Sequence, residues 1–116
     1  MHELSIAQNI IIIVEEELKK HGNKGTVKKV LFKSGRMNAI IPDSLKFGFD
    51  ILKKEKEVVK NAEIEIEEIP LKVKCTRCGT ESVIDEPAFF CPKCFSPDVE
   101  IIAGKEMWVE SIELDS

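Results

Sequence analysis

The chain has 116 residues, 43% of them hydrophobic and 33% charged, with a formal net charge of −4 at pH 7. This length suits one compact domain, or a small domain with a metal-held appendage. The acidic balance argues against a general binder of nucleic acid or anionic membranes. The longest apolar run, 10–14, is too short to span a bilayer, and no secretory signal opens the chain, so we expect a cytoplasmic protein with reduced thiols.

Residues 4–20 predict the first helix, because apolar residues recur there at spacings of three and four. The expected buried stripe consists of Leu4, Ala7, Ile11, Val14 and Leu18, widened by Ile10 and Ile13. Gly22 should end the helix. Its start is open: Ser5 and Gln8 could form a capping box, or the helix could begin at His2 or Glu3.

Three further elements precede the cysteines. Residues 27–34 read as a strand, and a second helix should begin at Pro42 and Asp43, with Leu45, Phe49 and Leu52 on one face. Residues 62–69 alternate glutamate and isoleucine, which predicts a strand with one face buried and one in water. After the cysteines, residues 105–114 predict a last strand.

This order predicts an α/β fold: a small three-stranded sheet with two helices on one face, which buries both apolar stripes. The last strand should return to that sheet, so a zinc ribbon would be inserted before it. We expect residues 1–70 plus 100–116 to form the α/β domain, and residues 71–99, which contain all four cysteines, to form the zinc-ribbon domain.

All four cysteines lie in two C-x-x-C pairs, Cys75 with Cys78 and Cys91 with Cys94. Two residues between thiols let one tight turn aim both sulfurs at a point, and two such turns give the tetrahedral thiolate set that suits Zn²⁺. Because four thiolates leave no open position, the zinc would be structural rather than catalytic.

Three other interpretations use the same residues. Two disulfides would need an oxidising compartment, which nothing in the sequence indicates. A redox-active C-x-x-C would need one metal-free pair of low pKa beside a βαβ pattern. Rubredoxin-type iron would take the same four ligands, so the metal's identity stays open.

Catalytic constellations are missing from the sequence. The histidines are His2 and His21, which make no Ser/His/Asp or Cys/His set, and no G-x-x-x-x-G-K-[ST] loop is present. We therefore expect a protein that is not an enzyme.

The N-terminus offers a different chemistry. The Met1 amine, the backbone nitrogen between Met1 and His2, and the His2 imidazole can close fused chelate rings in one plane. Planar nitrogen sets suit Ni(II) or Cu(II), and Glu3 could add a fourth donor through its amide or its carboxylate. The alternative is a mobile terminus without a ligand.

Several segments together resemble the HypA/HybF family of nickel metallochaperones, and the resemblance runs nearly end to end. They are Met1-His2-Glu3-Leu4-Ser5, the helix end at Lys20-His21-Gly22, Pro42-x-x-Leu45-x-Phe47-x-Phe49, Ala62-Glu63-Ile64-Glu65-Ile66, and the two cysteine pairs.

The resemblance implies Ni²⁺ as cargo at Met1, His2 and Glu3, and structural Zn²⁺ at Cys75, Cys78, Cys91 and Cys94. It also implies delivery to the large subunit of a nickel–iron hydrogenase, aided by a separate GTPase. A homodimer and a role in urease maturation are left open. The rival function is a zinc ribbon that binds nucleic acid, for which residues 71–99 hold four basic and four acidic residues.

Two positions depart from the family pattern. Phe95 follows the second cysteine pair where the family often has glycine, which predicts a different backbone geometry at Cys94. Arg36-Met37-Asn38 replace a glycine-containing turn that would otherwise be a candidate partner contact.

Overall fold

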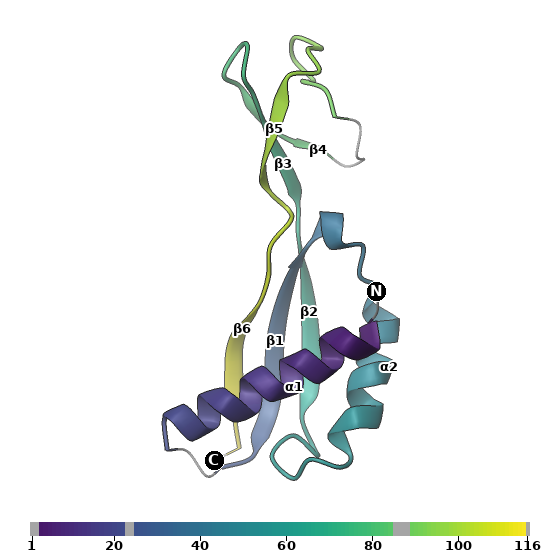
Figure 1. Ribbon diagram of the computed structural model, residues 1–116, viewed down its shortest axis with the longest axis vertical. Coiled ribbons are helices and arrows are strands. Elements are labelled where there is room, and N and C mark those ends of the chain that lie inside the picture. The colour runs from purple at the N-terminus through teal and green to yellow at the C-terminus, as the bar shows by residue number, and fades with distance from the viewer. Residues whose placement is uncertain (1–2, 23–24, 85–88, 116) are drawn as a thin grey trace. The chain divides into compact units, whose positions relative to one another are not determined.

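The computed structural model describes residues 3–22, 25–84 and 89–115 (Figure 1). The chain runs in the order α1 (Glu3–Lys20), β1 (Val27–Gly35), a 3₁₀ helix (Arg36–Asn38), α2 (Pro42–Lys53), β2 (Glu63–Ile69), β3 (Leu71–Cys75), β4 (Glu81–Ile84), β5 (Val99–Ala103) and β6 (Met107–Leu114).

Contacts divide the chain into two compact units. The helical unit takes in Met1–Lys33, Ile40–Glu67 and Trp108–Ser116, and the ribbon unit takes in Ser34–Ala39 and Glu68–Met107. The expected domain boundary after residue 99 falls at the start of β5, whose pairing with β3 groups residues 100–103 with the ribbon. Whether nickel and zinc binding divide between the two units stays a prediction.

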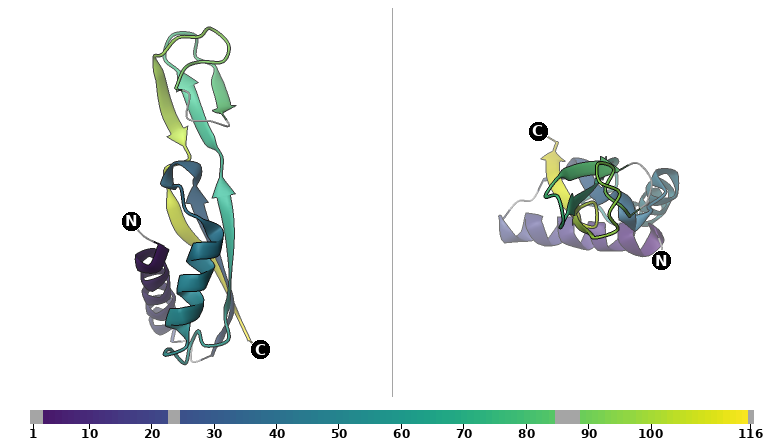
Figure 2. Two further views of the ribbon diagram at one scale, coloured as in Figure 1. Left: turned by 90° about the vertical axis from the view of Figure 1, so that its right-hand side faces the viewer. Right: turned by 90° about the horizontal axis from the view of Figure 1, so that it is seen from above.

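The helical unit contains a three-stranded sheet in the order β2-β1-β6, and both helices lie on the same side of it (Figure 2). The predicted sheet with two helices on one face is therefore confirmed, as is the return of the last strand. Its buried core is made of Ala7, Ile10, Ile11, Val14, Leu18, Val27, Val30, Phe32, Leu45, Phe49, Val59, Ala62 and Ile64.

Helix α1 begins at Glu3, so Ser5 lies within the helix and does not cap it. At the other end, the backbone N–H of Gly22 donates to the Lys19 carbonyl at 3.1 Å. Gly22 has a φ of 64°, a left-handed conformation in which glycine commonly ends helices.

Two residues of the expected apolar stripe of α1 are not buried. Leu4 is 53% exposed and Ile13 is 41% exposed. Leu4 lies over Gly48 of α2, which has no side chain to cover it. Ile13 lies beside the stripe, so the buried face is narrower than the sequence pattern predicts.

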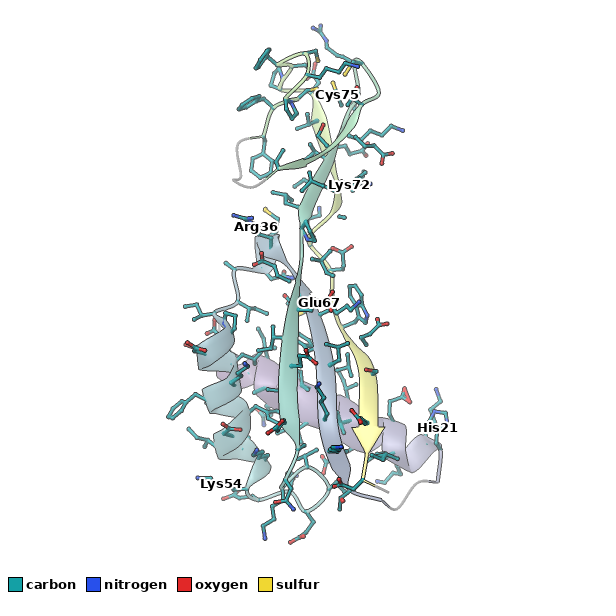
Figure 3. The ribbon with its side chains drawn as sticks, turned by 180° about the vertical axis from the view of Figure 1, so that it is seen from behind. His21, Arg36, Lys54, Glu67, Lys72 and Cys75 are labelled. Atoms are coloured by element: carbon teal, nitrogen blue, oxygen red, sulfur yellow. The ribbon has the colours of Figure 1, made fainter. Side chains whose placement is uncertain are left out.

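The helix-free face of the sheet carries lysine–glutamate pairs. Lys29 and Glu65 lie 2.8 Å apart across β1 and β2, and Lys33 lies 3.8 Å from Glu67 (Figure 3). A hydrogen bond and charge attraction raise the pKa of Lys29 and lower that of Glu65. The two glutamates are exposed and Lys33 is half-buried, and such pairs at a surface contribute little stability. The glutamates of β2 therefore lie on the solvated face that the alternation predicted.

The ribbon unit contains a second sheet in the order β4-β3-β5, with both pairings antiparallel. Among its described residues, the buried apolar cluster consists of Leu71, Val73 and Ile84, with the half-buried Val99 and Ile101 against them. Three apolar residues make a very small core, so this unit needs another source of stability.

The segment Ser34–Ala39 packs against the turn that precedes β6. The backbone N–H groups of Gly35 and Met37 donate to the carbonyls of Glu106 and Gly104, at 2.7 and 2.9 Å. The N–H of Gly104 donates to the Glu106 carboxylate at 2.5 Å, and backbone N–H groups of this turn lower the pKa of that carboxyl. Residues 36–38 therefore have a structural role within the ribbon unit.

Candidate metal centre

Four cysteine sulfurs converge at one end of the ribbon unit. The ligand atoms of Cys75, Cys78, Cys91 and Cys94 all lie within 4.8 Å of one another, and Figure 3 shows Cys75 at the end of β3. The Cys75 and Cys94 sulfurs are 3.6 Å apart, and those of Cys78 and Cys91 are 3.7 Å apart. Four sulfurs at tetrahedral Zn–S distances would be separated by about 3.8 Å. The four thiols are free, so a disulfide framework is not formed.

The two C-x-x-C turns have the same hydrogen bonds. In the first, the N–H of Cys78 donates to the Cys75 sulfur at 3.4 Å and the N–H of Gly79 donates to the Cys75 carbonyl at 2.9 Å. In the second, Cys94 and Phe95 donate to the sulfur and carbonyl of Cys91 at 3.4 and 2.8 Å. The two C-x-x-C motifs therefore form turns with the same hydrogen bonds. A backbone N–H that donates to a sulfur stabilises negative charge on that sulfur.

The backbone at Phe95 matches that of the corresponding residue in the first turn, and a departure from the family's geometry at Cys94 stays a prediction. Phe95 has a φ of 61° and Gly79 a φ of 75°, so both residues occupy the left-handed region. The hydrogen bonds of the turn require this conformation whichever side chain is present, and Phe95 adopts it despite its Cβ.

Residues after each turn extend the site, and the sequence analysis missed them. The N–H groups of Cys75 and Cys91 donate to the carbonyls of Thr80 and Ser96, at 2.9 and 2.8 Å. The Ser96 hydroxyl also accepts from the Asp98 N–H at 3.1 Å. The signal was a hydroxyl residue two positions after the second cysteine of each pair.

The thiol pKa values diverge. Hydrogen bonds from the Thr80 side chain and backbone lower the pKa of Cys78 to about 6, and the Cys94 backbone lowers that of Cys91. A backbone hydrogen bond from Ser96 lowers the pKa of Cys94, but the nearby Cys75 sulfur, burial and the other sulfurs together raise it to about 11. Four close thiols resist complete ionisation, and a bound dication would supply the compensating charge.

The charges of the ribbon are largely paired. Lys72 lies 3.2 Å from Glu81 and Arg77 lies 3.4 Å from Asp98, while Lys74 is opposite Glu100 in the β3–β5 register. These pairings leave no row of unpaired cations along the described strands of the ribbon, which weighs against a nucleic-acid-binding surface.

The N-terminal nickel prediction falls mainly outside the described residues, because Met1 and His2 are not among them. Glu3 is described: its carboxylate accepts a hydrogen bond from the Ile41 backbone N–H at 3.2 Å. His21 lies at the far end of α1, 3.3 Å from Glu17. Within the described part of the chain, no helix is long and apolar enough to cross a membrane.

Comparisons with known proteins cover almost the whole chain. Residues 1–114 match the family described as hydrogenase/urease nickel incorporation, metallochaperone, HypA. Hydrogenase maturation factor HypA of Desulfatibacillum aliphaticivorans is 41% identical over 98% of this chain and 87% of that protein. The factor of the same name from Trichormus variabilis is 42% identical over 99% of this chain and 96% of that protein.

A solved structure agrees with the sequence matches. The solution structure of the nickel metallochaperone HypA from Helicobacter pylori has a TM-score of 0.70 and 27% identity, covering 98% of this chain and 97% of that one. Because its sequence matches from end to end and its fold agrees, this chain belongs to the HypA family of nickel metallochaperones for hydrogenase maturation.

Proposed function

We propose that this protein binds Ni(II) at its N-terminus and delivers it to the large subunit of a nickel–iron hydrogenase, without catalysing a reaction itself. The match to the HypA family over residues 1–114 carries this proposal, because it includes the N-terminal residues that could bind the metal. The ligands would be Met1, His2 and Glu3, whose nitrogens can form the planar set that Ni(II) prefers.

The chemistry of a chain terminus supports a carrier. A carrier must both bind and release, and an acceptor can displace ligands from a terminus one at a time. A GTPase would be a separate partner, consistent with the missing nucleotide-binding loop in this sequence. We place the protein in the cytoplasm, where its thiols would stay reduced.

We further propose that Cys75, Cys78, Cys91 and Cys94 hold a structural zinc ion. The observed sulfur separations of 3.6 and 3.7 Å fit tetrahedral thiolate ligation. On this proposal nickel binding belongs to residues 1–70 plus 100–116 and zinc binding to residues 71–99. The closed thiolate set would stabilise the ribbon and take no part in nickel transfer.

Metal analysis of the untagged protein tests the proposal. We expect one zinc that survives dialysis and one nickel that a competing chelator removes. A matched protein with one extra alanine before Met1 converts the terminal amine to an amide, whose nitrogen binds a metal only after losing a tightly held proton. It should keep its zinc and bind nickel much more weakly. Equal nickel affinity in the two proteins would remove Met1 from the site.

A further inference from the structure

The ribbon unit exposes its aromatic residues instead of burying them. Its phenylalanines, Phe89, Phe90 and Phe95, are 40%, 42% and 72% exposed, whereas the buried cluster among its described residues is aliphatic. The rings of Phe90 and Phe95 stack on each other, with centroids 6.1 Å apart and planes 25° apart. We term these two residues the ring pair. Exposed aromatic side chains that add nothing to a core commonly mark a contact surface.

The second cysteine turn holds the Phe95 ring in a fixed place and at a conformational cost. Phe95 has a φ of 61°, which is unfavourable for a residue with a Cβ. Its N–H and that of Cys94 both donate to Cys91, and the Cys91 N–H donates to the Ser96 carbonyl, so the turn is well fixed. Gly79 takes the same place in the first turn without any side chain. The turn itself therefore does not need the ring.

The same turn carries a cation without a partner among the described residues. Lys93 lies between the two cysteines of the pair and is exposed, and no described carboxylate forms an ion pair with it. Arg77, on the first turn, lies instead 3.4 Å from Asp98. A carboxylate from a partner would supply the charge that complements Lys93.

The size and charge of this surface decide what kind of partner fits it. The exposed parts of the ring pair amount to roughly 200–300 Å² of apolar surface, since a phenylalanine side chain offers about 150–250 Å². A stable dimer buries about 800 Å² on each copy, so the ring pair is too small to join two copies of this chain. A single cation is also far from the positively charged groove that tracks a nucleic-acid backbone. A short peptide segment fits both properties.

We propose that the ring pair and Lys93 form a docking surface for a short segment of a partner protein that carries an apolar side chain close to a carboxylate. The apolar side chain packs on the rings, and the carboxylate pairs with the Lys93 ammonium, whose flexible stem lets it reach its partner. Because the turn is fixed before the segment arrives, little ordering cost is paid on binding. This inference does not depend on where nickel binds.

Selection from a displayed library of random dodecapeptides, on the full-length zinc-loaded protein, tests the chemistry of the partner. The selected peptides should share an aromatic side chain or leucine with an aspartate or glutamate a few positions away. In a heteronuclear NMR titration, the selected peptide should shift the amide signals of Phe90, Lys93 and Phe95. The signals of α1 and α2 should stay in place.

Substitutions of the ring pair test where the peptide binds. Phe95→Gly should weaken binding of the selected peptide by about tenfold, as expected for an aromatic anchor. It should keep its zinc and its fold, because Gly79 forms the equivalent turn. Phe90→Ala leaves the Phe95 backbone unchanged and should have a similar effect. Phe47→Ala is the matched control: it removes a ring that is 68% exposed on α2, and it should bind like wild type.

A double-mutant cycle tests the charge. Lys93→Gln should weaken binding by about threefold, the usual effect of one exposed ion pair. Replacing the carboxylates of the selected peptide by amides should have the same effect on wild type and no further effect on Lys93→Gln. Lys74→Gln is the matched control, because Lys74 is an exposed cation on β3 opposite Glu100. It should bind like wild type.

Several results would overturn the inference. A library that yields no shared pattern would do so, as would equal binding of the selected peptide by wild type and Phe95→Gly. Single-stranded DNA that binds wild type more tightly than any selected peptide would make the ring pair a stacking surface for bases. Self-association that Phe95→Gly abolishes would make it a contact between copies. None of these results bears on nickel binding, which metal analysis tests separately.

Discussion

Phe95 adopts a left-handed backbone conformation, and its side chain is mostly exposed. Its ring stacks on Phe90, with centroids 6.1 Å apart, yet Phe95 remains 72% exposed. A left-handed conformation costs a residue with a Cβ roughly 1–2 kcal/mol, and an aromatic pair returns roughly 0.5–1.5 kcal/mol. The side chain and the backbone therefore act in opposite directions at this one position.

We predict that Phe95→Ala lowers the stability of the ribbon by about 1 kcal/mol, because it loses the ring contact and keeps the strain. Phe95→Gly loses the same contact but relieves the strain, so it should be about 1 kcal/mol more stable than Phe95→Ala. Denaturant titration of zinc-loaded proteins measures both. An alanine variant as stable as the glycine variant would contradict the account of strain.

His2 should matter for nickel and not for stability. The first fully buried residue of α1 is Ala7, since Leu4 is half exposed, so His2 precedes the core. We predict that His2→Ala abolishes nickel binding, retains zinc, and changes the free energy of unfolding by less than about 0.5 kcal/mol. Nickel titration and thermal melting check the two halves. A variant that binds nickel as wild type does would remove His2 from the site.

Among the elements, those with strong periodicity were predicted well. Helix α1 and strand β2 have apolar residues at their proper periods, and both form close to the predicted bounds. Strand β5 was not predicted, because Val99–Ala103 gains its stability from pairing with β3, a contact that local sequence does not reveal. The exposure of Leu4 depends on Gly48, and only packing brings those two residues together.

The cysteine spacing predicted the convergence of four sulfurs, but it did not reveal how the surrounding backbone supports them. The contributions of Thr80 and Ser96 come from turn hydrogen bonds that only the folded chain displays. The carboxylate bond from Glu3 to Ile41 likewise joins residues far apart in sequence. Local spacing predicted which sulfurs come together, whereas the hydrogen bonds that surround them depend on the tertiary structure.

The contact between the 3₁₀ segment and the turn before β6 depends on Gly35. Its backbone, at φ −66° and ψ 148°, suits any residue, so conformational strain is not the reason for glycine. A Cβ there would lie only 2.1 Å from the Gly104 carbonyl carbon and oxygen, and 2.7 Å from the Lys105 nitrogen. These are backbone atoms of a hydrogen-bonded turn and cannot move aside cheaply.

We predict that Gly35→Ala destabilises the protein by about 2–3 kcal/mol through this clash. Gly22→Ala is the matched control, because Gly22 has a φ of 64° and open space around its Cα. It should cost only about 1 kcal/mol, from strain alone. Thermal melting compares the two. Equal losses would show that the turn before β6 can yield to the added methyl group.

At the scale of the whole molecule, the two units differ in what stabilises them. The helical unit buries a continuous set of apolar side chains from both helices and its sheet, whereas the apolar cluster in the described part of the ribbon unit has three buried residues. A core of that size cannot offset the entropy of ordering the ribbon. Structural zinc in a small domain contributes ~10 kcal/mol or more of folding free energy.

Removing the proposed zinc ion should therefore unfold the ribbon and leave the helical unit folded. We predict that chelation, or Cys78→Ala, abolishes the dispersed amide signals of β3, β4 and β5, while the helical circular dichroism of α1 and α2 is retained. Trp108 reports on the folded unit, because its indole N–H donates to Glu110 at 2.6 Å within it. Its fluorescence should change little on zinc loss and strongly on later thermal unfolding.

Nickel binding should survive in part, since its proposed ligands lie outside the ribbon. A Cys78→Ala protein with full zinc content would overturn the four-thiolate site, and simultaneous loss of the helical signal would mean that the two units fold as one.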